Sequence, residues 1–138
     1  MMPAEDIFVD TSAWVALADR DDNHHKSAAS VYPSLLKTYK KLITSNLIVA
    51  ETYILILKEL GHHAALIFLE KLKASPRILK IYSNEQMETE AGEILAKYSD
   101  QDFSYTDAVS FVIMKRQEIK KVFCFDKHFV TAGFASIP

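Results

Sequence analysis

The chain has 138 residues, so we expect one domain spanning residues 1–138. An apolar fraction of 49%, a charged fraction of 25% and only three glycines and four prolines exclude disorder and fibrous repeats. The 18 acidic and 16 basic residues give a net charge of −2, which excludes bulk attraction to nucleic acid or to an anionic membrane. Any nucleic-acid partner must therefore be held by local contacts.

Cysteine usage and the length of the apolar runs bear on where the protein acts. The single Cys124 cannot close an intrachain disulfide, and its apolar neighbours favour a small core residue in a reducing setting. The longest apolar runs, 13–18 and 64–69, fall far short of the roughly 20 residues that span a bilayer. Residues 1–6 lack the basic and apolar regions of a signal peptide. We therefore expect a cytoplasmic protein.

Apolar periodicity predicts short strands that alternate with helices. In chain order the pattern indicates a strand at 7–9, helices at 11–17 and 28–36, a strand at 42–44, helices at 47–60 and 62–74, a strand at 78–82, helices at 85–96 and 107–117, a strand at 122–125, a short helical turn and a tail at 134–138. Because a parallel crossover needs a connection of about this length, the order predicts a mainly parallel sheet. We expect a single three-layer α/β/α domain with its ligand crevice beyond the carboxyl ends of the strands.

Local signals set the boundaries of the first two helices. Asp10 ends the first strand, and Thr11 and Ser12 offer hydroxyls that can cap the helix that follows. Pro33 lies inside the second helical pattern, where it lacks a backbone donor and crowds the preceding turn. We therefore expect a break or kink at Pro33.

The later helices also carry start and stop signals. Either Ser45 or Asn46 is the predicted N-cap of the third helix, and Gly61 should end it. Asn84 is the predicted cap of the helix at 85–96, and Thr106 is the predicted cap of the helix that begins at Asp107.

Four carboxylates are predicted to lie near the carboxyl edge of the sheet. Asp10 and Asp126 each follow a strand, Asp107 opens a helix at the same edge, and Glu51 interrupts an otherwise apolar helix. Like charges that crowd together are unfavourable unless a cation joins them, and hard oxygen ligands suit Mg²⁺ or Mn²⁺. The pattern therefore indicates a divalent-metal site.

Each carboxylate also has a structural explanation. Asp10 and Asp107 could cap helices or complement the helix dipole, and Asp126 could be a turn residue. Glu51 is harder to explain in this way, because a lone carboxylate on an apolar helix is costly unless it is paired, metal-bound or turned to water.

At these positions the chain resembles the PIN-domain nucleases, and in particular their VapC-like toxin branch. The matching stretches are Val9-Asp10-Thr11-Ser12-Ala13-Trp14, Thr44-Ser45-Asn46-Leu47-Ile48-Val49-Ala50-Glu51, Asp102-Phe103-Ser104-Tyr105-Thr106-Asp107-Ala108 and Phe125-Asp126-Lys127-His128-Phe129. The resemblance implies that Asp10, Glu51, Asp107 and Asp126 hold Mg²⁺ or Mn²⁺ for hydrolysis of single-stranded RNA. No acidic position of the family pattern is missing.

The resemblance also implies supporting residues and partners. Thr11, Ser12 and Thr106 are hydroxyl residues next to the acidic positions, where they could orient a carboxylate or a metal-bound water, or simply cap helices. A VapC-like toxin is usually paired with a small antitoxin protein, whereas other PIN proteins act alone in RNA maturation. The apolar positions in 47–60 and 66–72 are mainly core, but two helices this apolar could leave a stripe for self-association. On that ground and by the resemblance we expect a homodimer.

Other polar residues near these motifs are open to simpler interpretations. Asp102 could touch the metal shell and His128 could approach substrate, but we expect Asp102 to bond its own loop backbone and His128 to lie at a surface turn. The pairs His24-His25 and His62-His63 lack the spacing and partners of a zinc site. Basic residues could guide RNA but are more often solvated helix ends; they form three groups, Lys37/Lys40/Lys41, Lys71/Lys73/Arg77 and Lys115/Arg116/Lys120/Lys121.

The sequence lacks residues that competing classes of enzyme require. A haloacid-dehalogenase-type phosphotransferase needs a second aspartate where Ser12 stands, and a receiver domain needs an aspartate after a middle strand. Three scattered glycines form no phosphate-binding loop. The alternative that the sequence leaves open is a non-catalytic RNA- or protein-binding module with a silent acidic pocket.

Overall fold

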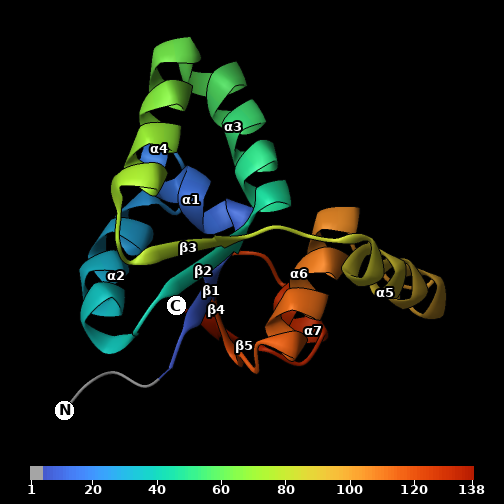
Figure 1. Ribbon diagram of the computed structural model, residues 1–138. Helices are drawn as coiled ribbons and strands as arrows, with labels where there is room; N and C mark the ends of the chain where they lie inside the picture. The colour runs from blue at the N-terminus through green and yellow to red at the C-terminus, as the bar shows by residue number, and fades with distance from the viewer. Residues whose placement is uncertain (1–4) are drawn as a thin grey trace.

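The computed structural model describes residues 5–138 and contains one parallel sheet flanked by helices (Figure 1). Residues 1–4, on which part of the signal-peptide expectation rests, lie outside the described residues. The sheet has the order β3-β2-β1-β4-β5, and its strands are β1 (Ile7–Val9), β2 (Leu42–Ser45), β3 (Ile78–Ile81), β4 (Lys121–Phe123) and β5 (Ala135–Ile137). The predicted α/β/α architecture is confirmed.

Seven helices connect or follow these strands within residues 5–138. They are α1 (Thr11–Ala18), α2 (His25–Thr38), α3 (Asn46–Leu60), α4 (His62–Ala74), α5 (Glu85–Lys97), α6 (Tyr105–Arg116) and α7 (His128–Thr131). Helix α1 packs against α2 and α3, and α3 pairs with α4, whereas α5 packs against α6 (Figure 1). In the described part of the chain no helix is both long and apolar enough to cross a membrane.

The topology brings the ends of two central strands together. β1 pairs with β2 on one side and with β4 on the other, and all pairs are parallel. The chain therefore leaves β1 and β4 at the same edge, on opposite sides of the point where the strand order switches. Such a switch point opens a crevice beyond the carboxyl ends of the strands.

Burial of apolar side chains fixes the elements that border this crevice. Phe8 and Phe123 from the central strands and Phe129 from α7 are fully buried, and the Phe8 and Phe129 rings pack 6.2 Å apart. Every residue of α6 from 107 to 114 is buried. Burying one such aromatic side chain contributes on the order of 2 kcal/mol, so α6 and α7 are held firmly against the sheet.

Several helix boundaries agree with the sequence and three do not. Ser45 caps α3, Gly61 ends it with a φ of +94°, and Asn84 caps α5, as predicted. Helix α2 continues through Pro33 instead of breaking there, since buried Leu35 holds the following turn against the core.

The other two corrections concern N-caps at the crevice. Asp10, for which capping was one of the two predicted roles, caps α1 by accepting a hydrogen bond from the Ser12 amide, and Thr11 and Ser12 do not. Ser104, rather than Thr106, caps α6, because Ser104 and Asp107 exchange side-chain to backbone hydrogen bonds in a capping box.

The predicted tail contains a strand. Residues 135–137 form β5, which extends the sheet beyond β4 and accepts a hydrogen bond from the Cys124 amide at Ile137. The ladder residues of β4 end at Phe123, two residues earlier than the sequence indicates. Asp126 therefore lies on a short loop after β4 and not directly at the strand end.

Candidate active site

Three of the four predicted carboxylates come from elements that meet at the switch point of the sheet. Asp10 follows β1, Asp126 follows β4 after a short loop, and Asp107 lies in the first turn of α6. The Asp10 amide donates to the Phe123 carbonyl at 3.0 Å, which ties the end of β1 to the end of β4. Asp10 and Asp107 are buried, with 4% and 6% of their surface exposed.

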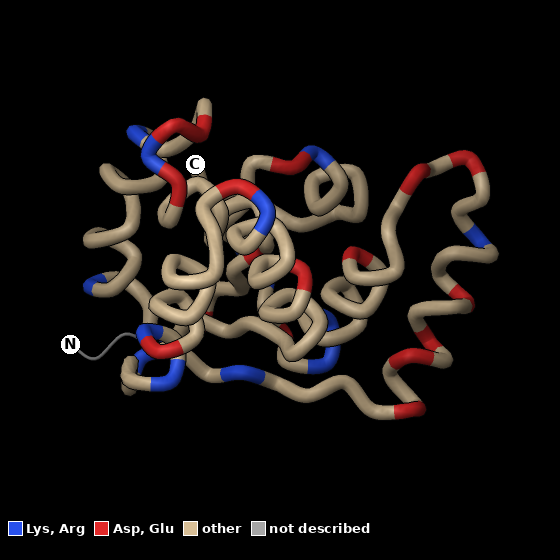
Figure 2. Tube along the Cα trace, turned by 90° about the horizontal axis from the view of Figure 1, so that it is seen from above, with Lys and Arg blue, Asp and Glu red and all other residues tan. Residues whose placement is uncertain are grey.

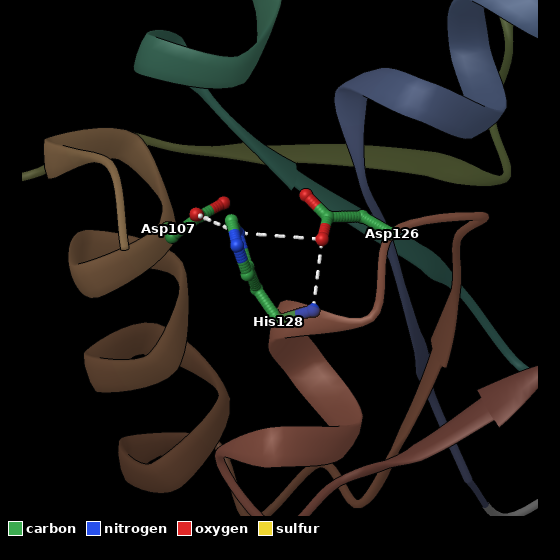
Figure 3. Close-up of side chains that lie close together, drawn as sticks. All are labelled: Asp107, Asp126 and His128. Carbon is green, nitrogen blue, oxygen red and sulfur yellow. Dashed lines mark hydrogen bonds and ion pairs between the residues drawn. The ribbon is translucent and has the colours of Figure 1, made fainter. Parts of the chain in front are cut away.

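Asp107 and Asp126 converge on the ring of His128 (Figure 3). His128 Nδ1 lies 2.8 Å from Asp107 Oδ2 and 3.3 Å from Asp126 Oδ1. The His128 amide also donates to Asp126 Oδ1 at 2.8 Å, which holds this carboxylate over the start of α7. The ligand atoms of the three residues lie within 4.8 Å of one another, a separation that one cation can bridge.

The expectation that His128 lies at a surface turn is wrong. Its side chain is only 17% exposed and is enclosed by the acidic residues of the crevice. Burial opposes protonation of the ring, but the hydrogen bond to Asp107 and the charges of Asp126 and Asp107 outweigh it and raise the pKa of the imidazole. The two carboxylates therefore favour the protonated form of the ring.

Asp102 joins the cluster through His128. Its Oδ1 lies 3.1 Å from His128 Nε2, although the Asp102 side chain is 90% exposed. The expectation that Asp102 bonds its own loop backbone is therefore wrong. It contacts His128 from the solvent side, on the face away from Asp107.

Ser12 connects Asp10 to the loop that carries Asp126. The Ser12 hydroxyl donates to Asp10 Oδ2 at 2.8 Å and accepts from the Phe125 amide at 3.0 Å. This chain of hydrogen bonds fixes the orientation of the Asp10 carboxylate relative to the neighbouring loop. Ser12 therefore has the geometry of a positioning residue, as one of its two predicted roles requires.

The other two hydroxyl residues differ from Ser12. The side-chain oxygen of Thr11 is buried and has no hydrogen-bond partner among residues 5–138. Thr106 lies within α6, where its carbonyl accepts from Ser110. Thr11 therefore offers a free hydroxyl beside Asp10, whereas Thr106 does not cap the helix.

Burial and neighbouring carboxylates raise two pKa values at the acidic cluster. Burial raises the pKa of Asp10 to about 6, against the opposing hydrogen bonds from Ser12, and the charge of Asp107 raises it further. Burial, together with the charges of Asp10, Asp126 and Asp107, raises the pKa of the Cys124 thiol to about 12. Cys124 is therefore a protonated core residue and not a nucleophile, as expected from the sequence.

Glu51 lies in the second turn of α3, half-buried, and forms no hydrogen bond or ion pair within residues 5–138. The group of three residues whose ligand atoms converge does not include it. Helix α3 begins at Asn46, directly after β2 ends at Ser45 on the same edge of the sheet as the end of β1. Glu51 thus belongs to an element that borders the crevice, and its place in the site stays a prediction.

The substitution Glu51→Gln separates a metal ligand from a structural residue. A carboxylate paired with a buried cation would cost roughly 3 to 5 kcal/mol when neutralised, but no such partner is present among the described residues. We therefore expect the metal-free variant to unfold at the same urea concentration as the wild type, and Mn²⁺ to bind more weakly. A strongly destabilised variant with wild-type Mn²⁺ affinity would remove Glu51 from the site.

The donor set fits a hard or borderline divalent cation. Carboxylate oxygens are supplied in a partly buried space by Asp10, Asp107 and Asp126. Because the ionised carboxylates repel one another, binding of a cation between them is favoured. The unpartnered Thr11 hydroxyl adds a further polar atom next to Asp10. No cysteine or second histidine joins the converging group in residues 5–138, so the set is not that of a structural zinc site.

The three basic groups lie away from this crevice. Lys41 Nζ donates to the Pro76 carbonyl at 2.8 Å, and Arg77 donates to the Tyr39 and Lys40 carbonyls, where β2 and β3 begin. Lys115 and Arg116 end α6, and β4 begins at Lys121. Because all strands are parallel, these positions lie toward the amino edge of the sheet, opposite the acids, and do not form an RNA-guiding rim around them.

The fold and the site define a class of three-layer α/β proteins with an acidic cluster at the carboxyl edge of a parallel sheet. The family model of the PIN domain matches residues 7–135, and the chain belongs to the PIN-domain family. The resemblance indicated by the sequence motifs is thereby confirmed.

Two comparisons identify similar proteins. The chain is 31% identical over 131 residues to the 23S rRNA-specific endonuclease VapC20 of Mycobacterium tuberculosis, covering 95% of this chain and 97% of the relative. The crystal structure of VapC20, described as a Sarcin-Ricin loop cleaving toxin, superposes with a TM-score of 0.88 at 30% identity and covers 95% and 98% of the two chains. FitAcB from Neisseria gonorrhoeae shares the fold, with a TM-score of 0.66 at 20% identity over 96% of each chain.

His128 and Ser104 have roles that the sequence did not predict: His128 lies between the acidic residues, and Ser104 caps α6. The spacing of Asp126 and His128 could have indicated that the two side chains lie close together. In the turn that they form, the Asp126 side chain accepts a hydrogen bond from the His128 amide, which brings both side chains to the same place. Ser104 and Asp107 also had the spacing of a capping box.

Proposed function

We propose that this protein is a metal-dependent endoribonuclease and the toxin of a toxin-antitoxin pair. The observation that carries the proposal is the convergence of Asp107 and Asp126 beside buried Asp10 in a PIN-domain crevice. We propose that Asp10, Glu51, Asp107 and Asp126 hold Mg²⁺ or Mn²⁺. The bound ion would supply charge neutralisation at the scissile phosphate and an acidified water.

The residues of the chain have separable roles in this proposal. Asp107 and Asp126 present carboxylate oxygens from α6 and from the loop after β4, on rigid elements packed against the sheet. Ser12 holds the carboxylate of Asp10 in one orientation. The carboxylates bind the cation and do not attack the phosphate themselves. Without a bound cation, the negative charge of these carboxylates would repel the phosphate.

The charge distribution restricts how RNA reaches the crevice. Four glutamates lie along α5, which packs against α6 beside the pocket (Figure 2). One of them, Glu88, accepts from the Tyr105 hydroxyl at 2.7 Å, at the first residue of α6. Phosphates approaching from this side meet like charge, so we propose that RNA enters from the side of α1 and α3.

We propose ribosomal RNA of the large subunit as the substrate class. The support is the likeness to VapC20 over nearly the whole of both chains, in sequence and in structure. RNA nucleases select exposed, unstacked loop nucleotides by shape, and the short motifs of this sequence encode no base readout.

Ribosomes and isolated 23S rRNA test the proposal directly. Purified protein with Mn²⁺ should cut at one loop, mapped by primer extension, and a chelator should abolish cutting. Cleavage at many unrelated positions would contradict rRNA specificity but keep the nuclease. Binding of RNA without cleavage in any divalent ion would favour the non-catalytic module instead.

We also propose an antitoxin partner, a homodimer and a cytoplasmic site of action. The hairpin of α3 and α4 exposes large apolar side chains: Ile54, Leu55, Leu57, Leu60 and Leu66. A surface of this kind on a small protein favours association with a second copy. Induction without the neighbouring gene should arrest growth, and a stand-alone RNA-maturation nuclease would not do so.

A further inference from the structure

The ring of His128 is held on three sides. Nδ1 faces Asp107 Oδ2 at 2.8 Å and Asp126 Oδ1 at 3.3 Å (Figure 3), and Nε2 faces Asp102 Oδ1 at 3.1 Å. The ring of Phe103 packs edge-on against the imidazole at 5.5 Å. This enclosure fixes which nitrogen points into the crevice and which points out.

The outward contact determines what the inward nitrogen can do. When Nε2 carries the proton and donates it to Asp102, Nδ1 presents a lone pair to the space between the two carboxylates. Histidines that bind metals commonly donate their other ring N–H to a carboxylate, which fixes the tautomer and the ring orientation. Asp102, His128 and the space beside Asp107 have this arrangement.

We propose that His128 is a metal ligand through Nδ1 and that Asp102 is the positioning residue that orients it. This inference rests on the proposed function, because it adds a nitrogen donor to the acidic site assigned there. A cation bound by Asp107, Asp126 and His128 takes the place of the Nδ1 proton. Imidazole suits transition metals better than Mg²⁺, so the site should prefer Mn²⁺ to Mg²⁺.

A spectroscopic measurement tests the ligand itself. Electron spin echo modulation of Mn²⁺ bound to the full chain should show coupling to a coordinated ¹⁴N nucleus. The variant His128→Gln keeps an N–H toward Asp102 but has no lone-pair nitrogen in the Nδ1 position, so the coupling should vanish. Its Mn²⁺ dissociation constant should rise at least about tenfold, with a smaller change for Mg²⁺. His62→Gln, on the exposed start of α4, should leave the signal unchanged.

A matched pair of loop variants tests the positioning role. Asp102→Asn and Asp100→Asn each remove one negative charge from the same exposed loop, but only Asp102 contacts His128. We expect Mn²⁺ affinity to fall about 10- to 100-fold in Asp102→Asn. It should change little in Asp100→Asn, because salt screens an exposed and distant charge.

The outcomes separate this inference from the proposed function. Wild-type protein that binds Mn²⁺ and cuts RNA without ¹⁴N coupling would overturn the ligand assignment alone. Equal loss of affinity in the two loop variants would overturn the role of Asp102. Wild-type protein that binds no Mn²⁺ would overturn both proposals. If His128→Gln fails to fold, the ¹⁴N signal of the wild type and the exposed loop pair still decide the outcome.

Discussion

Replacing Asp107 with asparagine is expected to reduce metal-dependent RNA cleavage by more than about 100-fold. Loss of a residue that only orients a ligand costs about 10- to 100-fold, so loss of a charged ligand should cost at least as much. The asparagine side chain can still accept from the Ser104 amide, and the backbone amide of residue 107 still donates to the Ser104 hydroxyl, so the capping box of α6 keeps both of its bonds. Single-turnover cleavage at several Mn²⁺ concentrations measures the effect.

The fold of the Asp107→Asn variant provides the control. Removing a negative charge from the first turn of a helix costs about 0.3 to 1 kcal/mol through the helix dipole, which leaves the variant folded. Asp100→Asn, an acid-to-amide change on an exposed loop, should retain wild-type cleavage. A folded Asp107→Asn variant that cleaves within a few-fold of wild type would show that Asp107 is only a capping residue.

Metal-free Asp10→Asn protein is expected to be more stable than the wild type at neutral pH. Burial raises the pKa of Asp10 from 3.8 to about 6, so near pH 7 the folded protein holds an ionised, buried carboxylate whose desolvation cost the unfolded chain does not bear. A shift of this size corresponds to about 3 kcal/mol. Asparagine caps a helix as well as aspartate does and carries no charge, so the variant keeps the α1 cap without the desolvation cost.

The sign of this effect gives it a characteristic pH dependence. A raised pKa stabilises the folded state fully below about pH 4, and this contribution is lost as the pH rises through about 6. Wild type and variant should therefore have similar urea midpoints near pH 4 and diverge toward pH 7. Parallel pH profiles, or a variant that is less stable at pH 7 in chelator, would contradict the account.

The sequence predicted the parts of the site that follow from strand order. Asp10 and Asp126 come after strands with buried apolar residues, and parallel strands place such residues at one edge. Ser45 and Gly61 are strong local signals, and both boundaries agree with the structure. These features depend on near neighbours in the chain, which a single sequence displays.

The parts that were missed depend on contacts between distant segments. His128 meets Asp107 across 21 residues and Asp102 across 26, and only tertiary packing brings them together. β5 has three residues and pairs with one neighbour, so its pattern is too short to distinguish it from a tail. Pro33 was expected to break or kink α2, but the helix continues through it, because packing overrides the local preference of proline.

The central claim is that the crevice of Asp10, Asp107 and Asp126 binds a divalent cation that RNA cleavage requires. Thermal unfolding with and without Mn²⁺ tests the binding most directly, because a ligand that binds only the folded state must stabilise it. At a free Mn²⁺ concentration 100 times the dissociation constant, the gain should be about 2.7 kcal/mol. The account predicts this gain for the wild type and its loss in an Asp10→Asn/Asp107→Asn double variant. An unchanged wild-type midpoint in millimolar Mn²⁺, or an equal rise in the double variant, would contradict it.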